Sequence, residues 1–190
     1  MSNNEVMIIG GGLAGVEAAW QVARLGVRVR LYEMRPVKQT PAHRTDKLAE
    51  IVCSNSLKSD EPGSAPYLLK EELRRAGSLV LEAATATRVP AGAALAVDRH
   101  QFAEYITAKI ESAPNIELIR EEVTRIPVNQ ITVVATGPLS SDALTAEIMR
   151  LTGQLGMPGP VVCQPYYNLL NRMPEVEILP ACAHYGIGVT

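Results

Sequence analysis

The sequence predicts an α/β fold with a parallel sheet, on the basis of three observations in its first 33 residues. An apolar run, Val6 to Ile9, is typical of a strand buried on both faces. Gly10 to Gly12 follow at once, and apolar residues then recur at helical spacing as far as Leu25. A second apolar run, Val27 to Tyr32, ends at Glu33. This order of strand, glycine turn, helix and strand indicates a Rossmann-like dinucleotide-binding domain.

The glycine turn predicts a loop that binds the phosphates of a dinucleotide. Gly10 allows a tight turn out of the strand, Gly12 lets a phosphate approach the backbone, and Gly15 lets the helix lie close to the sheet. The candidate cofactor-binding residues of this loop are Gly10, Gly11, Gly12, Leu13, Ala14 and Gly15. The alternative is an ordinary strand-to-helix turn without a ligand, and the complete motif context argues against it.

Glu33 completes the predicted cofactor site at the end of the second strand. A carboxylate at this place can accept hydrogen bonds from both hydroxyls of an adenosine ribose. An acid favours a ribose without a phosphate, so FAD or NAD fits better than NADP. The turn alone does not choose between FAD and NAD.

Length and composition indicate an ordinary globular protein. The chain has 190 residues, 47% of them hydrophobic and 20% charged, and a formal net charge of -2. This charge gives no global electrostatic case for binding nucleic acid or an anionic membrane. No apolar run approaches the ~20 residues of a membrane span, and the start lacks the features of a signal peptide. We therefore expect a cytoplasmic location and no membrane partner.

The cysteines do not predict a metal site. They are odd in number, and no CxxC pair occurs. Cys163, Cys182 and His184 match no usual metal-ligand spacing.

We divide the chain into a dinucleotide-binding domain over residues 1–153 and a divergent C-terminal tail over 154–190. Residues 34–66 form a long insertion rich in proline, of the kind that often carries function. The elements expected after Glu33 are a short helix over 47–52, one amphipathic helix over 67–84, a strand over 94–97, a helix over 99–111, strands over 116–119, 123–126 and 131–135, a helix ending near 151, and tail strands over 161–163 and 176–179.

Other polar residues carry weaker predictions. Arg35, Lys38, Arg44 and Lys47 make the insertion locally basic, and they either contact a phosphate backbone or form a solvated loop. His43 is predicted as a hydrogen-bonding loop residue rather than a general base. Asp98 is predicted as a helix cap rather than a catalytic carboxylate.

Six segments between Val6 and Gly153 strongly resemble the TrmFO family of tRNA (uracil-5-)-methyltransferases, relatives of the GidA-type flavoproteins. They are GGGLAGVEAAW, LYEMRPVKQTPAHRTDKLAEIVCSNSLKSDE, LLKEELRRAGS, VPAGAALAVDRHQFAEYI, IREEVTRIP and VVATGPLSSDALTAEIMRLTG. The resemblance implies FAD as cofactor, NAD(P)H as reductant and 5,10-methylenetetrahydrofolate as one-carbon donor. It also implies tRNA as substrate, methylated on carbon-5 of the T-loop uridine.

Cys53 is the candidate catalytic residue, because Cys53 to Ser56 match the family's CSNS motif. A thiolate is suited to adding at carbon-6 of uracil, which makes carbon-5 nucleophilic. The resemblance leaves open whether the thiol attacks uracil or protects the flavin. The alternative for an isolated cysteine is a small buried core residue.

The sequence leaves three functions open. The first is the TrmFO-type methyltransferase or its N-terminal part. The second is a GidA-like enzyme acting on the tRNA wobble uridine, or another FAD oxidoreductase. The third is a non-catalytic nucleotide-binding fragment, since family members are more than twice as long and 154–190 does not resemble their continuation. For that reason we expect the sheet to be incomplete relative to the family.

Overall fold

The computed structural model of the chain describes residues 5–159, 162–163, 175 and 178–189. The chain divides into two compact units, Met1–Ser141 and Asp142–Thr190. The domain boundary after residue 153 stays a prediction. The first unit contains, in chain order, β1 (Glu5–Ile9), α1 (Leu13–Arg24), β2 (Arg28–Tyr32), β3 (Ser56–Ser59), α2 (Ala65–Arg75), α3 (Leu79–Ala86), β4 (Arg88–Val89), β5 (Ala94–Val97), α4 (Arg99–Ser112), β6 (Ile116–Ile119), β7 (Ile131–Val134) and the 3-10 turn η1 (Gly137–Leu139).

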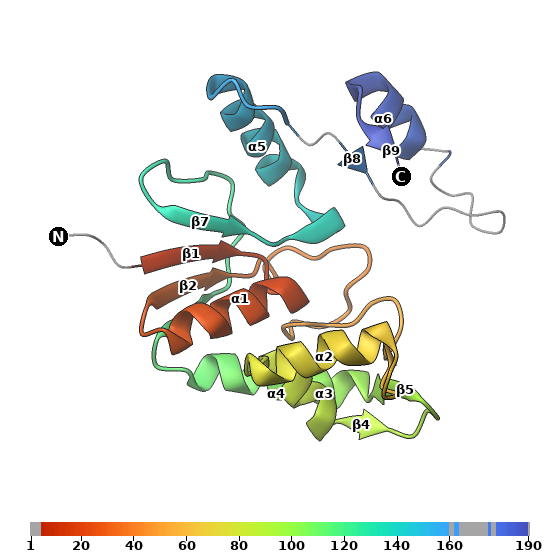
Figure 1. The fold of residues 1–190 in the computed structure, drawn as a ribbon. Coiled ribbons are helices and arrows are strands. Elements are labelled where there is room, and N and C mark those ends of the chain that lie inside the picture. Colours follow the sequence, from red (N-terminus) through yellow and green to blue (C-terminus); the bar gives the residue numbers. More distant parts are fainter. Residues whose placement is uncertain (1–4, 160–161, 164–174, 176–177, 190) are drawn as a thin grey trace. The chain divides into compact units, whose positions relative to one another are not determined.

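The first unit contains a four-stranded sheet with the order β6-β2-β1-β7, of which Figure 1 labels β2, β1 and β7. All of its neighbouring strands run parallel. β1 lies inside the sheet because both of its faces are apolar, and Met7, Ile8 and Ile9 are all buried. The predicted α/β fold with a parallel sheet is therefore confirmed. A second, antiparallel sheet with the order β3-β5-β4 was not expected from the sequence.

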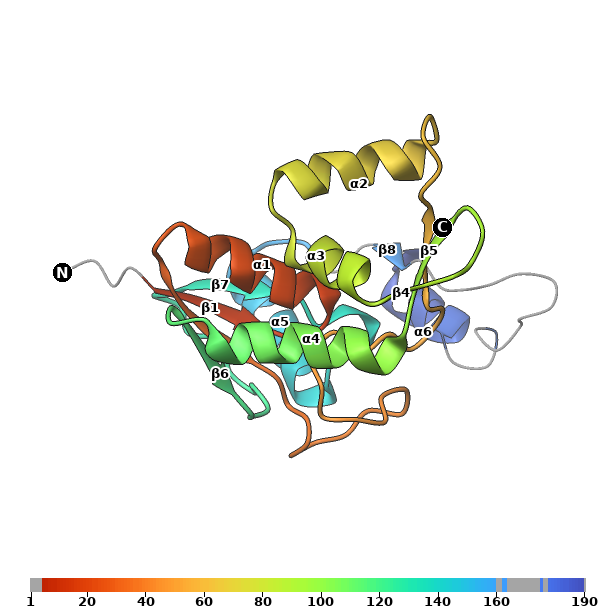
Figure 2. The same ribbon diagram turned by 90° about the horizontal axis from the view of Figure 1, so that it is seen from below.

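Helices α1 and α4 cover one face of the parallel sheet, and α3 packs against both of these helices (Figure 2). Val16 of α1, Leu79 of α3 and Phe102 of α4 are fully buried in one cluster with Ile8 and Leu31 of the sheet. Burying a side chain of this size contributes about 1.5–3 kcal/mol. This core holds the carboxyl ends of β1 and β2 at one edge of the sheet, where the glycine turn and Glu33 follow.

The helix expected over 67–84 is in fact two helices, α2 and α3. Gly77 has a φ of +70°, a left-handed conformation that ends α2. Ser78 then starts α3, because its Oγ accepts a hydrogen bond from the Leu81 backbone N–H at 3.2 Å. The leucines expected on the apolar side of α2 are largely exposed, Leu68 by 60% and Leu69 by 56%.

Three further expectations about local structure are wrong. Residues 47–52 are not helical, because the backbone N–H groups of Leu48 and Ala49 bond to the Thr107 hydroxyl and the Gly11 carbonyl instead of to local carbonyls. Residues 123–126 form no strand. In the tail, 178–179 begin helix α6, while 176–177 lie outside the described residues.

The second unit contains α5 (Asp142–Gln154), β8 (Val162–Cys163), α6 (Ile178–Tyr185) and β9 (Gly188–Val189), and β8 pairs with β9 in parallel. Within the described part of the chain, no helix combines the length and the apolar character needed to cross a membrane.

Candidate functional site

The glycine turn joins β1 to α1 through close backbone contacts, which leave no room for a side chain at Gly10 or Gly15. Gly10 has a φ of +107°, and a Cβ built on it would lie 2.7 Å from the Ala135 carbonyl oxygen. A Cβ on Gly15 would collide with the Gly10 carbonyl oxygen. Gly12 differs, since a Cβ there would meet no described atom within 4 Å. The turn is therefore closed toward the sheet and open at Gly12.

The first turn of α1 lies beside this open position. Gly12 is the N-cap, and among the described residues no side chain caps the helix and no acid occupies its first turn. Leu13 and Ala14 are exposed. Helix N-termini carry backbone N–H groups and a partial positive charge that favour anions. The geometry suits a pyrophosphate that approaches over Gly12.

Glu33 is brought against the glycine turn, as a shared cofactor site requires. Its Oε2 accepts a hydrogen bond from the Gly11 backbone N–H at 3.0 Å. Its Oε1 accepts from the Arg35 backbone N–H at 3.0 Å and from Arg35 Nε at 2.9 Å. Burial alone would raise the pKa of the Glu33 carboxyl, but the bonds and charge of Arg35 outweigh it and hold the pKa below its ordinary value. Glu33 is therefore ionised at neutral pH.

The predicted basic cluster does not exist as four equivalent charges. Arg35 is 1% exposed and forms ion pairs with Glu33 and Glu50, so it neither contacts a phosphate backbone nor lies in a solvated loop. Lys38 pairs with Glu122 at 2.7 Å, while Arg44 is exposed. The burial of Arg35 was missed because arginine is rarely buried. Glu33, two residues before Arg35, was the available signal for an ion pair, whereas Glu50 lies fifteen residues later.

Cys53 is exposed, which contradicts the alternative of a buried core cysteine. Its backbone oxygen accepts a hydrogen bond from Arg99 Nη2 at 3.2 Å, at the start of α4. Four residues earlier, the Ala49 N–H donates to the Gly11 carbonyl oxygen at 2.8 Å. At 3.8 Å per residue, the Cα of Cys53 lies within ~15 Å of the Cα of Ala49. The exposed thiol is thus on a segment attached to the glycine turn.

His43 and Asp98 have the structural roles predicted for them. Asp98 Oδ1 accepts from the His100 and Gln101 backbone N–H groups, both at 3.0 Å, and so caps α4. The His43 ring nitrogen Nδ1 lies 2.6 Å from the Thr40 hydroxyl. Burial and the Arg35 charge lower the pKa of His43, which keeps the ring neutral at neutral pH.

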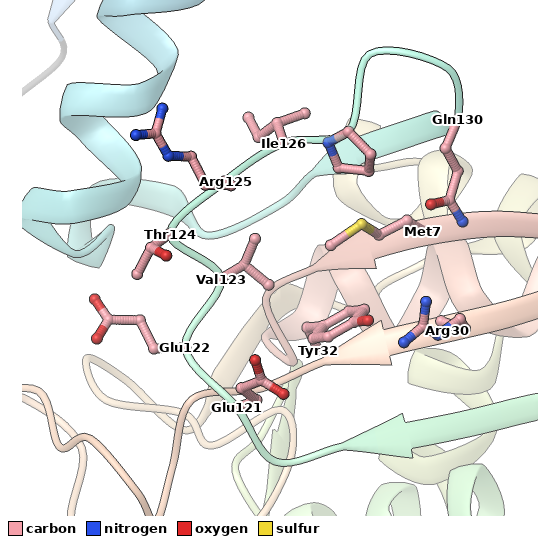
Figure 3. Close-up of a pocket in the computed structure, with 11 residues that line it drawn as sticks. Met7, Arg30, Tyr32, Glu121, Glu122, Val123, Thr124, Arg125, Ile126 and Gln130 are labelled. Atoms are coloured by element: carbon pink, nitrogen blue, oxygen red, sulfur yellow. The ribbon is translucent and has the colours of Figure 1, made fainter.

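A pocket of about 430 Å³ lies on the face of the parallel sheet opposite to α1 and α4 (Figure 3). Met7, Arg30 and Tyr32 form its floor, because side chains alternate along a strand and their neighbours Ile8, Val29 and Leu31 face the core. The segment 121–127 forms the other wall. Among the described residues, the predicted site residues do not line this pocket. No group of three or more metal-ligating side chains occurs in the described residues either.

Comparison with known proteins identifies the family. The sequence model of "Glucose inhibited division protein A" matches residues 5–160. Curated relatives named methylenetetrahydrofolate--tRNA-(uracil-5-)-methyltransferase TrmFO include one from Koribacter versatilis, 63% identical over 80% of this chain and 34% of that protein. Those from Aquifex aeolicus and Bacillus subtilis are 61% and 55% identical, over 78% and 81% of this chain and 34% and 35% of those proteins.

The chain spans about a third of the length of these curated relatives. Among solved structures, GidA from Aquifex aeolicus has a TM-score of 0.51 and 24% identity, covering 65% of this chain and 20% of that one. That likeness concerns the fold alone. The family model covers well over half of the chain, and the predicted resemblance to TrmFO proteins is confirmed. The chain therefore belongs to the glucose inhibited division protein A family, with TrmFO proteins as its relatives.

Proposed function

We propose that this chain forms the dinucleotide-binding part of a folate- and FAD-dependent tRNA (uracil-5-)-methyltransferase. The observation that carries the proposal is the exposed Cys53 thiol on a segment that is hydrogen-bonded to the glycine turn. The activity for which relatives at 55–63% identity are named agrees with it. NAD(P)H as reductant and a cytoplasmic location are further parts of the same proposal.

The fit of FAD rests on the glycine turn. Gly12 leaves space for the pyrophosphate, the first-turn N–H groups of α1 face that space, and Glu33 lies beside Gly11 as acceptor for the adenosine ribose. When bound and reduced by NAD(P)H, the flavin would supply the two electrons that convert a transferred methylene group to a methyl group. NAD as the resident dinucleotide would use the same turn, so the flavin spectrum is the deciding observation.

Cys53 is assigned to the uracil. Its thiolate adds to carbon-6 of the T-loop uridine, and the carbon-5–carbon-6 π electrons form an enolate. Carbon-5 then bonds to the methylene carbon of 5,10-methylenetetrahydrofolate as one carbon–nitrogen bond of the folate opens. The second carbon–nitrogen bond breaks when the methylene group is reduced to methyl, and tetrahydrofolate is the leaving group. Loss of the carbon-5 proton restores the double bond and expels the thiolate, so Cys53 is regenerated. Exposure suits this role, because a tRNA base must reach the sulfur.

Two measurements test the proposal. The purified protein should bind FAD near equimolar amounts, with flavin absorbance that follows the protein through gel filtration. In a full-length relative carrying this region, labelled methylene from the folate should reach the T-loop uridine, and Cys53→Ala should abolish transfer while Cys53→Ser keeps the fold. A protein that refuses FAD, or a Cys53→Ala enzyme with full transfer, refutes the proposal.

A further inference from the structure

Arg35 connects the glycine turn to the loop that precedes Cys53. Its Nε lies 2.9 Å from Glu33 Oε1, and its Nη1 lies 3.0 Å from Glu50 Oε2. The same Nη1 donates to the Thr45 carbonyl oxygen at 3.2 Å. The guanidinium is 1% exposed, so these bonds are shielded from water. One side chain thus contacts two carboxylates that are seventeen residues apart in the sequence.

Each of the two carboxylates also accepts hydrogen bonds from backbone N–H groups. Glu33 accepts from the Gly11 N–H in the glycine turn. Glu50 accepts from the Arg44 N–H at 2.9 Å, the Thr45 N–H at 3.1 Å and the Thr45 hydroxyl at 2.8 Å. Backbone and hydroxyl donors outweigh burial and hold the pKa of Glu50 below its ordinary value. A continuous chain of hydrogen bonds therefore runs from Gly11 to the 44–50 loop.

The end of this loop returns to the glycine turn. The Ala49 N–H donates to the Gly11 carbonyl oxygen at 2.8 Å. Ala49 has a φ of +52°, which is unfavourable for a residue with a side chain and needs support from its surroundings. The Leu48 N–H bonds to Thr107 Oγ1 at 2.9 Å. The hydrogen bonds of Leu48 and Ala49, together with the φ of Ala49, fix the direction of the backbone after Ala49. Cys53 follows four residues later.

We propose that Arg35 is a positioning residue. Through Glu33 and Glu50 it holds the segment that carries Cys53 at a fixed position relative to the dinucleotide bound at the glycine turn. The proposal rests on the proposed function, because it takes the dinucleotide and Cys53 as parts of one site. An arginine is needed, since its planar fork reaches two carboxylates at once and stays charged when buried. The consequence is coupling: occupation of the glycine turn changes the surroundings of Cys53, and the coupling passes through Glu50.

Glu50→Ala is the variant of choice. Replacing Arg35 would leave two shielded carboxylates without their cation and can unfold the protein. Removing the Glu50 side chain leaves the Arg35–Glu33 pair and the Gly11 bond in place. Glu50→Gln keeps an acceptor for the loop and should rescue part of the effect. Glu122→Gln, which breaks the more exposed pair with Lys38, is the matched control.

The first readout needs no ligand. Hydrogen exchange at the Leu48 and Ala49 amides should accelerate at least about tenfold in Glu50→Ala, less in Glu50→Gln and not in Glu122→Gln. Ser78→Ala lowers the stability of the unit at a position outside this hydrogen-bond network. It should not change the exchange rates of the Leu48 and Ala49 amides relative to those of the other amides of the unit. Unchanged exchange at Leu48 and Ala49 in Glu50→Ala overturns the proposal, whether or not FAD binds.

The second readout measures coupling. Alkylation of Cys53, followed on its peptide by mass spectrometry, should be slowed by FAD at least about fivefold in the wild type. In Glu50→Ala this ratio should approach one, although FAD still binds. An unchanged ratio, or a wild type in which bound FAD has no effect on Cys53, overturns the positioning role. If the wild type binds no FAD, the proposed function is refuted instead. Hydrogen exchange at the Leu48 and Ala49 amides then tests only whether Glu50 holds the 44–50 loop in place.

Discussion

Replacing Gly12 by alanine should separate ligand binding from folding. Gly12 has φ −75° and ψ −176°, an extended conformation that alanine adopts without strain. An added Cβ meets no described atom within 4 Å. Alanine is a poorer N-cap than glycine, but it also restricts the unfolded chain, and the two effects oppose each other. We expect the free energy of unfolding to change by less than about 0.5 kcal/mol.

The same methyl group should weaken the binding of a dinucleotide. It occupies the space through which a pyrophosphate reaches the first-turn N–H groups of α1. Losing one hydrogen bond to a charged group costs about 1.5–3 kcal/mol. At about 1.4 kcal/mol per factor of ten, the Kd for FAD should rise roughly 10- to 150-fold.

Flavin fluorescence titration and thermal melting by circular dichroism measure the two effects separately. Gly15→Ala is the contrasting variant, because its Cβ would collide with the Gly10 carbonyl oxygen. Overpacking of this kind costs about 1–3 kcal/mol, so stability and affinity should fall together. A Gly12→Ala protein that melts like the wild type and binds FAD with the same Kd would refute the assignment of this turn as the phosphate site.

Other substitutions test the fold and its charges. The pKa of Glu33 in the folded protein lies below its ordinary 4.5, so as the pH falls Glu33 takes up a proton in the unfolded chain before it does so in the folded protein. The melting temperature should therefore fall as the pH drops from 4.5 through the pKa of the folded protein. Glu33→Gln should flatten this part of the plot of melting temperature against pH. Ser78→Ala should lower the free energy of unfolding in urea by about 1–2 kcal/mol, more than Ser64→Ala at the less buried cap of α2, and equal losses would contradict this. A thiol reagent should modify Cys53 in the folded protein, whereas Cys182, 5% exposed, should react on unfolding; rapid native labelling of Cys182 would show the burial to be wrong.

The elements near the start of the chain were predictable because one local pattern decides them. β1, α1 and β2 lie within about one residue of their expected bounds. In each, apolar spacing, a glycine and the next element all favour the same structure. The helix over 67–84 failed where two local signals compete. Its helical spacing continues through Gly77, but the left-handed Gly77 and the Ser78 cap stabilise a break.

The 47–52 segment shows why part of the site could not be predicted. Its residues have a fair propensity for helix, and a helix would satisfy its backbone locally. The structure satisfies it with partners far away in the sequence, Gly11 and Thr107. Arg35 was misjudged for the same reason, because its partner Glu50 is fifteen residues away. Hydrogen bonds between residues so far apart depend on the fold, and no periodic pattern in the sequence indicates them.

The structure narrows what Glu33 can do for a ribose. A carboxylate offers about four acceptor positions, and the described residues use three of them, through the Gly11 N–H and two donors of Arg35. One position on Oε2 is left, so Glu33 can accept from one ribose hydroxyl while it keeps Gly11. We therefore expect that removing one of the two hydroxyls from an adenosine ligand lowers affinity roughly tenfold or more, while removing the other has little effect. Titration with the 2′-deoxy and 3′-deoxy forms of ADP decides this. Equal losses from both would mean that the ligand displaces the Gly11 bond and that Glu33 changes partners on binding.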